Sequence, residues 1–208
     1  MMHAMVEKTR QPKGLRDITR DAVRNSISDV AVDLSAERGF DAVTVEDIAQ
    51  TVGISARSFH RYFPAKEDAV LGDSTPWGEL VREVVATRPD DEPVWQCLQT
   101  AYEALLGQFG ELDARMKRRL RVLGSTPSLR ARNMEKHLQW EAMLTPLIAA
   151  RLPGQNTTLR ARTIIQASLA CWDIALATWA EESETRSAGH LLALTFAELS
   201  PNTAGPGA

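Results

Sequence analysis

The sequence predicts an all-α protein with two parts, a short N-terminal three-helix domain and a larger C-terminal helical domain. Apolar residues recur every three or four positions through most of the chain, as in helices that pack one face against a core. No segment alternates apolar and polar residues in the way that a half-exposed strand does. Glycine and proline stand between the periodic segments, where helices are expected to end.

Two helices are expected before the turn at Gly53. The first runs from about Asp17 to Arg38, and Gly39 directly after it is a typical stop. Thr44 is suited to cap the second helix, because Asp47, three residues further on, can return the hydrogen bond in a capping box.

A sharp turn and a third helix follow. Gly53 supplies the permissive backbone that the turn requires, and Ser55 is a good N-cap for the third helix. Pro64 is expected to end this helix, and a fourth helix is expected to start near Lys66 and to join the two parts of the chain.

The chain beyond the break at Ser74-Thr75-Pro76 is expected to form six more helices. One ends near residue 87, and the others cover about 93–109, 111–123, 128–151, 159–182 and 185–199. The predicted organisation is a flexible basic arm (1–14), a first helical domain (15–72), a larger second helical domain (73–199) and a disordered tail (200–208).

Composition and charge limit the possible classes of protein. The chain is 44% hydrophobic and 25% charged with a formal net charge of −3, so a surface that binds an anionic partner must be local. Cys97 and Cys171 are far apart and no apolar signal segment is present, which favours a reduced, cytoplasmic setting. The longest apolar run, 164–180, is too short and too polar for a membrane span, so no membrane partner is expected.

The third helix has the pattern of a recognition helix. At about 100° per residue, Arg57, His60 and Arg61 lie on one side while Phe59 and Phe63 lie on the other. Helix-turn-helix proteins place such a helix in the major groove, where arginines one turn apart reach guanine edges or phosphates. The alternative, a helical pair with a merely solvated charged face, remains open from periodicity alone.

The same stretch resembles the DNA-binding signature of the TetR family of transcriptional regulators, and the similarity covers about residues 17–72. The resemblance rests on Thr44-Val45, Ile48-Ala49, Val52-Gly53-Ile54-Ser55, Phe59, Arg61-Tyr62-Phe63-Pro64 and Lys66-Glu67. It implies an all-α homodimer that carries an N-terminal DNA-binding domain and a larger C-terminal domain for an effector and the partner subunit.

The resemblance also implies which residues contact DNA. Thr44 and Lys66 would touch phosphates, and Tyr62 would flank the site. His60 departs from the aromatic residue usual in the family, so its contact would depend on pH. The expected DNA-binding residues are Thr44, Ser55, Arg57, Ser58, His60, Arg61, Tyr62 and Lys66.

The C-terminal domain is rich in large aromatic side chains, which could line an apolar pocket or simply form the core. A carboxylate on an apolar helix needs a partner, and we expect Asp173 to pair with an arginine rather than to anchor a ligand. The candidate ligand-binding residues are Trp95, Tyr102, Phe109, Arg119, Trp140, Leu144, Cys171, Trp172 and Asp173.

A basic segment, 115–121, with Arg130, Arg132 and Lys136 nearby, has two interpretations. It could bind an anionic effector such as an acyl-coenzyme A, and residues 117–132 loosely resemble TetR-type domains that accept such ligands. The favoured alternative is a solvated helix face. Its arginines would then pair with the nearby carboxylates Glu103, Glu111 and Asp113.

The last two helices are expected to form the homodimer seam, because Ala188, Leu191, Leu192, Phe196 and Leu199 make an apolar stripe. Such a dimer would place two recognition helices on a palindromic operator.

We therefore expect a ligand-responsive regulator, most simply a repressor that leaves double-stranded DNA when a small hydrophobic or acyl-coenzyme-A-like effector binds. A helical interaction module without DNA binding is the alternative. A metal-dependent enzyme is disfavoured, because His137 and Glu141 form an i,i+4 pair without a third ligand. No metal, cofactor or catalytic residue is expected.

Overall fold

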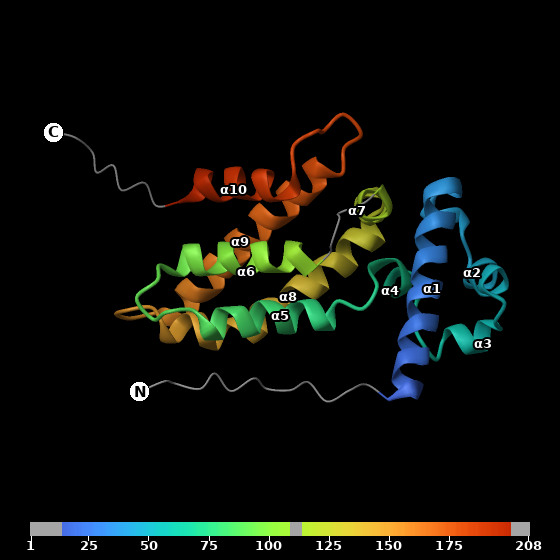
Figure 1. Ribbon diagram of the computed structural model, residues 1–208, viewed down its shortest axis with the longest axis horizontal. Helices are drawn as coiled ribbons and strands as arrows, with labels where there is room; N and C mark the ends of the chain where they lie inside the picture. Colours follow the sequence, from blue (N-terminus) through green and yellow to red (C-terminus); the bar gives the residue numbers. More distant parts are fainter. Residues whose placement is uncertain (1–13, 109–113, 201–208) are drawn as a thin grey trace.

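A computed structural model describes residues 14–108 and 114–200. Within these two ranges all regular secondary structure is helical. Most of the expected arm and tail, and Phe109, lie outside the described residues. The N-terminal domain lies at one end of an elongated molecule (Figure 1). It comprises α1 (Leu15–Arg38), the 3-10 helix η1 (Phe40–Ala42), α2 (Val45–Val52), α3 (Ala56–Phe59) and α4 (Lys66–Leu71).

The other six helices form the C-terminal body, and α7 of this body packs against α1 and α4 of the N-terminal domain (Figure 1). They are α5 (Thr75–Thr87), α6 (Val94–Gln108), α7 (Ala114–Ser125), α8 (Pro127–Ala150), α9 (Thr157–Trp179) and α10 (Ala188–Leu199). The predicted all-α fold with an N-terminal helix-turn-helix is confirmed. Among the described residues, no helix is both long and apolar enough to cross a bilayer.

Capping side chains fix the helix-turn-helix as the sequence predicts. The backbone N–H of Asp47 donates to Thr44 Oγ1 at 3.1 Å, and the N–H of Thr44 donates to Asp47 Oδ2 at 2.9 Å. Gly53 has a left-handed backbone (φ 81°), and the N–H of Ser58 donates to Ser55 Oγ at 3.1 Å. Each contact satisfies a helix N-terminal donor that would otherwise lack a partner.

The third helix is shorter than expected. It ends at Phe59, and the chain continues as a turn in which the N–H of Arg61 donates to the carbonyl of Ser58 at 3.2 Å. This tighter spacing agrees with the influence of Pro64, which disfavours helical geometry in the residue before it. The prediction that Pro64 directly ends the helix is therefore wrong, although Arg61 still lies outside the core.

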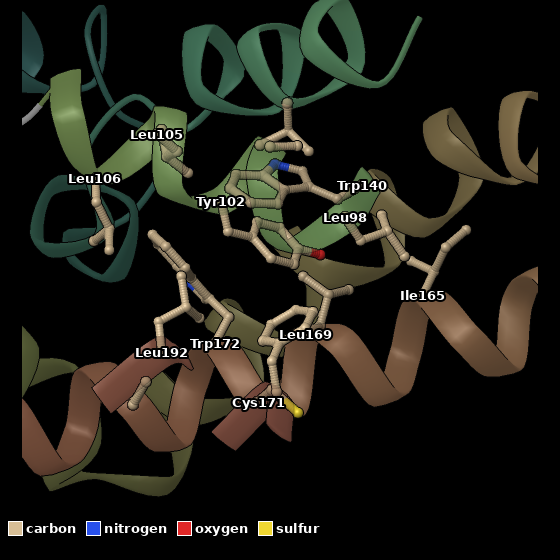
Figure 2. Close-up of a cluster of buried hydrophobic side chains, with 14 of the residues drawn as sticks. Leu98, Tyr102, Leu105, Leu106, Trp140, Ile165, Leu169, Cys171, Trp172 and Leu192 are labelled. Carbon is tan, nitrogen blue, oxygen red and sulfur yellow. The ribbon is translucent and has the colours of Figure 1, made fainter. Parts of the chain in front are cut away.

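Each domain has its own apolar core. In the body, Leu98 and Tyr102 of α6 converge with Trp140 of α8 and with Leu169 and Trp172 of α9 (Figure 2). Full burial of one large apolar side chain stabilises a fold by about 1.5–3 kcal/mol, so this cluster holds the helices together. The N-terminal core includes Ile27, Ile48, Phe59 and Phe63, and also Val122 and Leu129 of the body.

The apolar stripe on α10 does not provide the expected seam. Leu191, Leu192 and Phe196 are buried within their own subunit, packed with α6 and α9. Phe196 lies against Trp95, with ring centroids 4.7 Å apart. Helical spacing identifies a face that packs, but it does not say whether that face packs against the same chain or another.

Candidate DNA-binding surface and ligand cavity

The face of α3 and the turn after it combine exposed basic groups with a buried aromatic anchor. Arg57, His60 and Arg61 are exposed, whereas Phe59 and Phe63 are fully buried. The two phenylalanine rings lie 6.1 Å apart in the N-terminal core. Within 14–108 and 114–200, neither arginine has an ion pair with a carboxylate. Both guanidinium groups are therefore available to a partner outside the chain.

The capping side chains of α2 and α3 are accessible to solvent. Thr44 and Ser55 are exposed and Ser58 is half-buried. The Thr44 hydroxyl donates to Asp47 Oδ2 at 2.6 Å, and this hydrogen bond, with that of the Thr44 N–H, lowers the pKa of Asp47. Helix N-termini that face outward suit phosphate oxygens, because their N–H groups and dipoles favour negative charge.

Lys66 contacts the protein itself. Its ammonium donates to the carbonyl oxygens of Phe40 at 2.9 Å and Val43 at 2.8 Å, and it lies 4.2 Å from the centre of the Phe40 ring. The side chain thus holds η1 against the start of α4. A phosphate contact from this ammonium would have to compete with two carbonyl groups.

A surface groove adds residues that the sequence pattern did not identify. The groove, of about 640 Å³, is lined by Arg16, Thr19 and Arg20 of α1 together with Arg61 and Tyr62. The basic character of the N-terminal segment is visible in the sequence, but its approach to Arg61 depends on how α1 packs. The cations of this groove extend the exposed basic surface beyond α3.

The basic segment of α7 faces the N-terminal domain. Arg115 Nη1 lies 2.8 Å from Asp29 Oδ2, and Arg118 Nη1 lies 2.6 Å from Asp33 Oδ1. Glu103, the partner expected from the sequence, instead accepts a hydrogen bond from Gln99. The pairing expected with Glu103 is therefore wrong for these arginines, because the carboxylates that they meet come from α1, more than 80 residues earlier. Glu111 and Asp113, the other expected partners, lie outside the described residues.

Arg119 lies at the centre of this contact. Its Nη1 donates to Ser28 Oγ at 2.8 Å and to the carbonyl of Val70 at 3.1 Å, and its Nη2 lies 3.3 Å from Asp29 Oδ1. Gly72 makes room for the guanidinium, since a Cβ at this position would lie 2.9 Å from Arg119 Nη1. One side chain therefore joins α1, the end of α4 and α7.

A second arginine reinforces the junction between the domains. Arg132 of α8 donates to both carboxylate oxygens of Asp68, at 2.7 and 3.0 Å. Asp68 also accepts from the backbone N–H of Ala65 at 3.0 Å, which caps α4. A bidentate pair of this kind adds geometric specificity as well as charge attraction. We call the contacts of Arg115, Arg118, Arg119 and Arg132 the domain clamp.

A cavity of about 610 Å³ adjoins the clamp and is lined by residues of both domains. Arg119, Trp140 and Trp172, which the sequence analysis proposed, contribute to its wall. Trp77 also lines it, as does Lys136, one of the cations that the sequence places near the basic segment 115–121. A volume of this size is within the range of ligand sites, which span about 300–1,000 Å³.

Trp140 forms part of the wall because α5 carries glycine opposite it. A Cβ at Gly78 would lie 2.6 Å from Trp140 Nε1, so any larger residue would displace the indole. Lys136, one turn earlier on α8, has its ammonium 5.2 Å from the centre of the Trp140 ring. Burial lowers the pKa of Lys136 to about 8.

Five other proposed ligand residues do not line this cavity. The Tyr102 hydroxyl lies 3.1 Å from Ser168 Oγ in the core, and Trp95 Nε1 donates to the carbonyl of Phe196. Leu144 is buried with them in the core. Cys171 Sγ donates to the carbonyl of Thr195 at 3.4 Å. An aromatic residue in the core and one in a cavity wall have the same helical spacing, so the sequence could not separate them.

Asp173, the fifth, has no arginine partner among the described residues, contrary to expectation. Its carboxylate lies 3.3 Å from His137 Nδ1 and 3.5 Å from Asn133 Nδ2. Burial raises the pKa of Asp173 and lowers that of His137 to about 3. The imidazole is therefore neutral at pH 7, so its contact with Asp173 is not an ion pair.

Glu141, the other member of the i,i+4 pair, accepts hydrogen bonds from Arg162 and Gln166. It and His137 thus bind different partners. Within the described ranges, no group of three or more His, Cys, Asp or Glu side chains could hold a metal ion.

Comparison with known proteins identifies both halves of the chain. Residues 27–71 match the family model described as bacterial regulatory proteins, tetR family, and residues 92–204 match the model described as the MftR C-terminal domain. A candidate mycofactocin biosynthesis transcriptional regulator of Mycobacterium tuberculosis, MftR, is 30% identical over 151 residues, which cover 70% of this chain and 73% of MftR. TcmR, a helix-turn-helix transcriptional regulator of Streptomyces glaucescens, is 31% identical over 144 residues, or 66% of this chain and 64% of TcmR.

Solved structures show the same fold. FadR of Thermus thermophilus, a TetR-family transcriptional repressor in complex with lauroyl-CoA, aligns with a TM-score of 0.52 and 21% identity. The alignment covers 89% of this chain and all of FadR. The matched domains, the relatives and the helix-turn-helix geometry agree, and the chain belongs to the TetR family of DNA-binding transcriptional regulators.

Proposed function

We propose that this protein is a ligand-responsive repressor that binds a palindromic operator as a homodimer and leaves it when a small effector fills the cavity. The observation that carries the proposal is the pair of exposed arginines, Arg57 and Arg61, opposite a buried aromatic anchor. Arginines at this place in a recognition helix reach base edges or phosphates in the major groove. An operator on the chromosome agrees with the expected cytoplasmic location.

The residues that we propose for DNA contact fall into two groups. The side chains of Arg57, His60 and Arg61 face outward and would enter the groove. Thr44, Ser55, Ser58 and Tyr62 would contact phosphates beside it, as would Arg16 and Arg20 of the surface groove. For Lys66 we propose mainly a supporting role, because its ammonium already holds two carbonyl groups.

The proposed homodimer uses the outer faces of the last two helices, α9 and α10. Ile174 on α9 is 59% exposed and Leu194 on α10 is 43% exposed, and Leu159 and Leu199 are also exposed. Large apolar side chains gathered on two adjacent helices are typical of a surface that another subunit covers. Ile174, Leu194 and Leu159 join Leu199, the exposed member of the predicted stripe, as candidates for the seam, in place of its buried members.

The proposed effector is a hydrophobic or acyl-coenzyme-A-like molecule. The cavity walls carry three tryptophans, Trp77, Trp140 and Trp172, and basic groups line it as well. FadR, which shares the fold, binds lauroyl-CoA. The wall belongs to both domains, so a ligand that fits one relative placement of the domains better than another would shift their equilibrium.

Arg119 connects the ligand cavity to the N-terminal domain. It lines the cavity and also contacts Ser28, Asp29 and the carbonyl of Val70 in the N-terminal domain. A ligand that changes the position of Arg119 would change the contacts that hold α1 and α4. The spacing of the two recognition helices in the dimer would then no longer match the DNA.

The test begins with selection of bound duplexes from a random-sequence DNA pool. We expect a consensus with two-fold symmetry, and we expect the double variant R57A/R61A to lose affinity for it. R82A is the matched control, since Arg82 pairs with Glu79 on the surface of α5. Addition of lauroyl-CoA should weaken binding by the wild-type protein. Unchanged binding by R57A/R61A would instead support a helical interaction module that does not use this surface for DNA.

A further inference from the structure

The cavity contains one cation that has no counter-ion within it. Arg115 and Arg119 pair with Asp29, and Arg24 Nε lies 3.9 Å from Asp73 Oδ2. Lys136 differs from these three. Among the residues that the structure describes, its ammonium has no hydrogen-bond acceptor and no carboxylate within 4.0 Å. The ammonium instead lies over the face of the Trp140 ring.

The carboxylate of Asp173 attracts Lys136 but does not form an ion pair with it. Asp173 raises the pKa of Lys136 only through space, and its oxygens are engaged by His137 and Asn133. Burial outweighs this attraction and lowers the pKa of Lys136 to about 8, so the amine remains mostly protonated at pH 7. An ammonium on an apolar wall is costly unless an anion accompanies it.

The surroundings of Lys136 show what the rest of a ligand would meet. Trp77, Leu80, Met116, Leu120 and Leu176 line the same cavity and are apolar. A molecule that fits must therefore present a sizeable apolar part to these walls. A single charged group would have to be placed at Lys136.

We propose that the effector is an anionic amphiphile whose head group, a carboxylate or a phosphate, pairs with Lys136 Nζ while its apolar chain fills the cavity. This inference rests on the proposed function and defines the chemistry of its effector. The cation–π contact with Trp140 holds the ammonium in place before the ligand arrives. Arg119 does not need to leave the domain clamp to neutralise the head group.

The test compares three probes with the same twelve-carbon chain, namely dodecanoate, dodecyl phosphate and dodecanol. Isothermal titration calorimetry of the full-length protein should show at least one of the two anions binding tenfold or more tighter than the alcohol. The preference between carboxylate and phosphate identifies the head group. In K136M, which keeps the length of the side chain, the affinity of that anion should fall at least tenfold while that of dodecanol does not fall.

Two further variants control this comparison. K136R keeps the charge and should retain the preference for the anion. R24M removes a cavity-lining cation that already has Asp73 nearby, so its effect on anion binding should be smaller than threefold. Wild-type affinity in K136M, a loss in R24M alone, or equal binding of anion and alcohol by the wild-type protein would overturn the assignment.

DNA binding separates this inference from the proposed function. Wild-type protein and K136M should bind the selected duplex equally well without amphiphile. If both bind DNA and no probe binds the cavity, the effector assignment is wrong and the DNA-binding function stands. If the wild-type protein selects no duplex at all, the proposed function itself fails, whatever the amphiphiles do.

Discussion

The arginines of α3 and the turn after it resemble those of α7 in the sequence, but the two sets have opposite surroundings in the structure. Arg57 and Arg61 face outward with no carboxylate partner among the described residues. Arg118 and Arg119 face α1, where Asp33 and Asp29 accept them. A basic run therefore does not by itself indicate an anion-binding site. The available counter-charges decide whether arginines bind a partner or hold two domains together.

The largest expected difference between the two sets is their response to salt. An increase in NaCl from about 50 to 200 mM should weaken binding of the dimer to its operator on the order of 10³-fold, as counterions released from DNA are replaced. The thermal midpoint of the free protein should change little, because the domain clamp is partly buried and screened less. Anisotropy titrations and thermal melts measure the two effects. Equal salt sensitivity of folding and DNA binding would remove the distinction.

Substitution of the exposed pair should affect DNA binding alone. We expect R57A/R61A to lose about 2–4 kcal/mol of DNA-binding free energy, because each arginine that reaches a base or phosphate contributes about 1–3 kcal/mol. Its thermal midpoint should match that of the wild-type protein. R118A removes an exposed pair of the clamp and should leave intrinsic DNA affinity within about threefold. A reversed pattern between these variants would contradict the proposed division of roles.

Substitution of two glycines that both have positive φ tests whether the space beside Arg119 matters for stability. Gly72 (φ +79°) and Gly39 (φ +82°) both strain any side chain, but only at Gly72 would a Cβ meet Arg119, 2.9 Å from Nη1. We expect G72A to lose about 2–4 kcal/mol of unfolding free energy and G39A about 1–3 kcal/mol. Denaturant unfolding measures both. Equal losses would show that the position of Arg119 contributes nothing.

Removal of one carboxylate from α1 should affect the clamp according to how deeply the partner arginine is buried. Asp29 serves Arg115 and Arg119, whose side chain is 17% exposed, whereas Asp33 serves Arg118, which is 43% exposed. We expect D29A to destabilise the protein by about 1–2 kcal/mol and D33A by less than about 1 kcal/mol. Thermal melts at matched salt provide the comparison, and a larger loss in D33A would show that burial does not set the strength of these pairs.

Lys136 should produce a stability difference that depends on pH. Its pKa is lowered to about 8 in the folded protein, so the unfolded chain binds more protons between pH 8 and its usual pKa of 10.5. The unfolding free energy of the wild-type protein relative to K136M should therefore rise by about 3 kcal/mol over that interval, at about 1.4 kcal/mol for each unit of pKa difference. A constant difference between the two proteins, measured by denaturant unfolding from pH 7 to 10, would place the ammonium in solvent.

Local chemistry explains which parts of the fold could be predicted from the sequence. The Thr44–Asp47 capping box, the left-handed Gly53 and the opposed faces of Arg57 and Phe59 depend on residues within four positions of one another. The family signature over the same residues strengthened the prediction. The end of α3 could not be predicted, because the side-chain pattern continues through the turn in which the N–H groups of Arg61 and Tyr62 donate to the carbonyls of Ser58 and Phe59.

The remaining features depend on contacts between distant segments. Asp29 meets Arg115 across 86 positions, and Arg119 meets the carbonyl of Val70 across 49. Helical spacing marks Tyr102 and Trp140 alike as inward-facing, yet Tyr102 is enclosed in the core while Trp140 borders the cavity. Gly78 decides the position of Trp140, and it lies on another helix.

The central claim is that Arg57 of α3 and Arg61 of the turn after it bind DNA while the arginines of α7 stay on α1. A crystal structure of the full-length protein with its selected duplex tests it most directly. We expect the guanidinium groups of Arg57 and Arg61 within hydrogen-bonding distance of bases or phosphates in successive major grooves, with Arg119 still on Asp29 and Ser28. A complex in which α3 faces solvent, or in which the α7 arginines contact the duplex, would contradict the account.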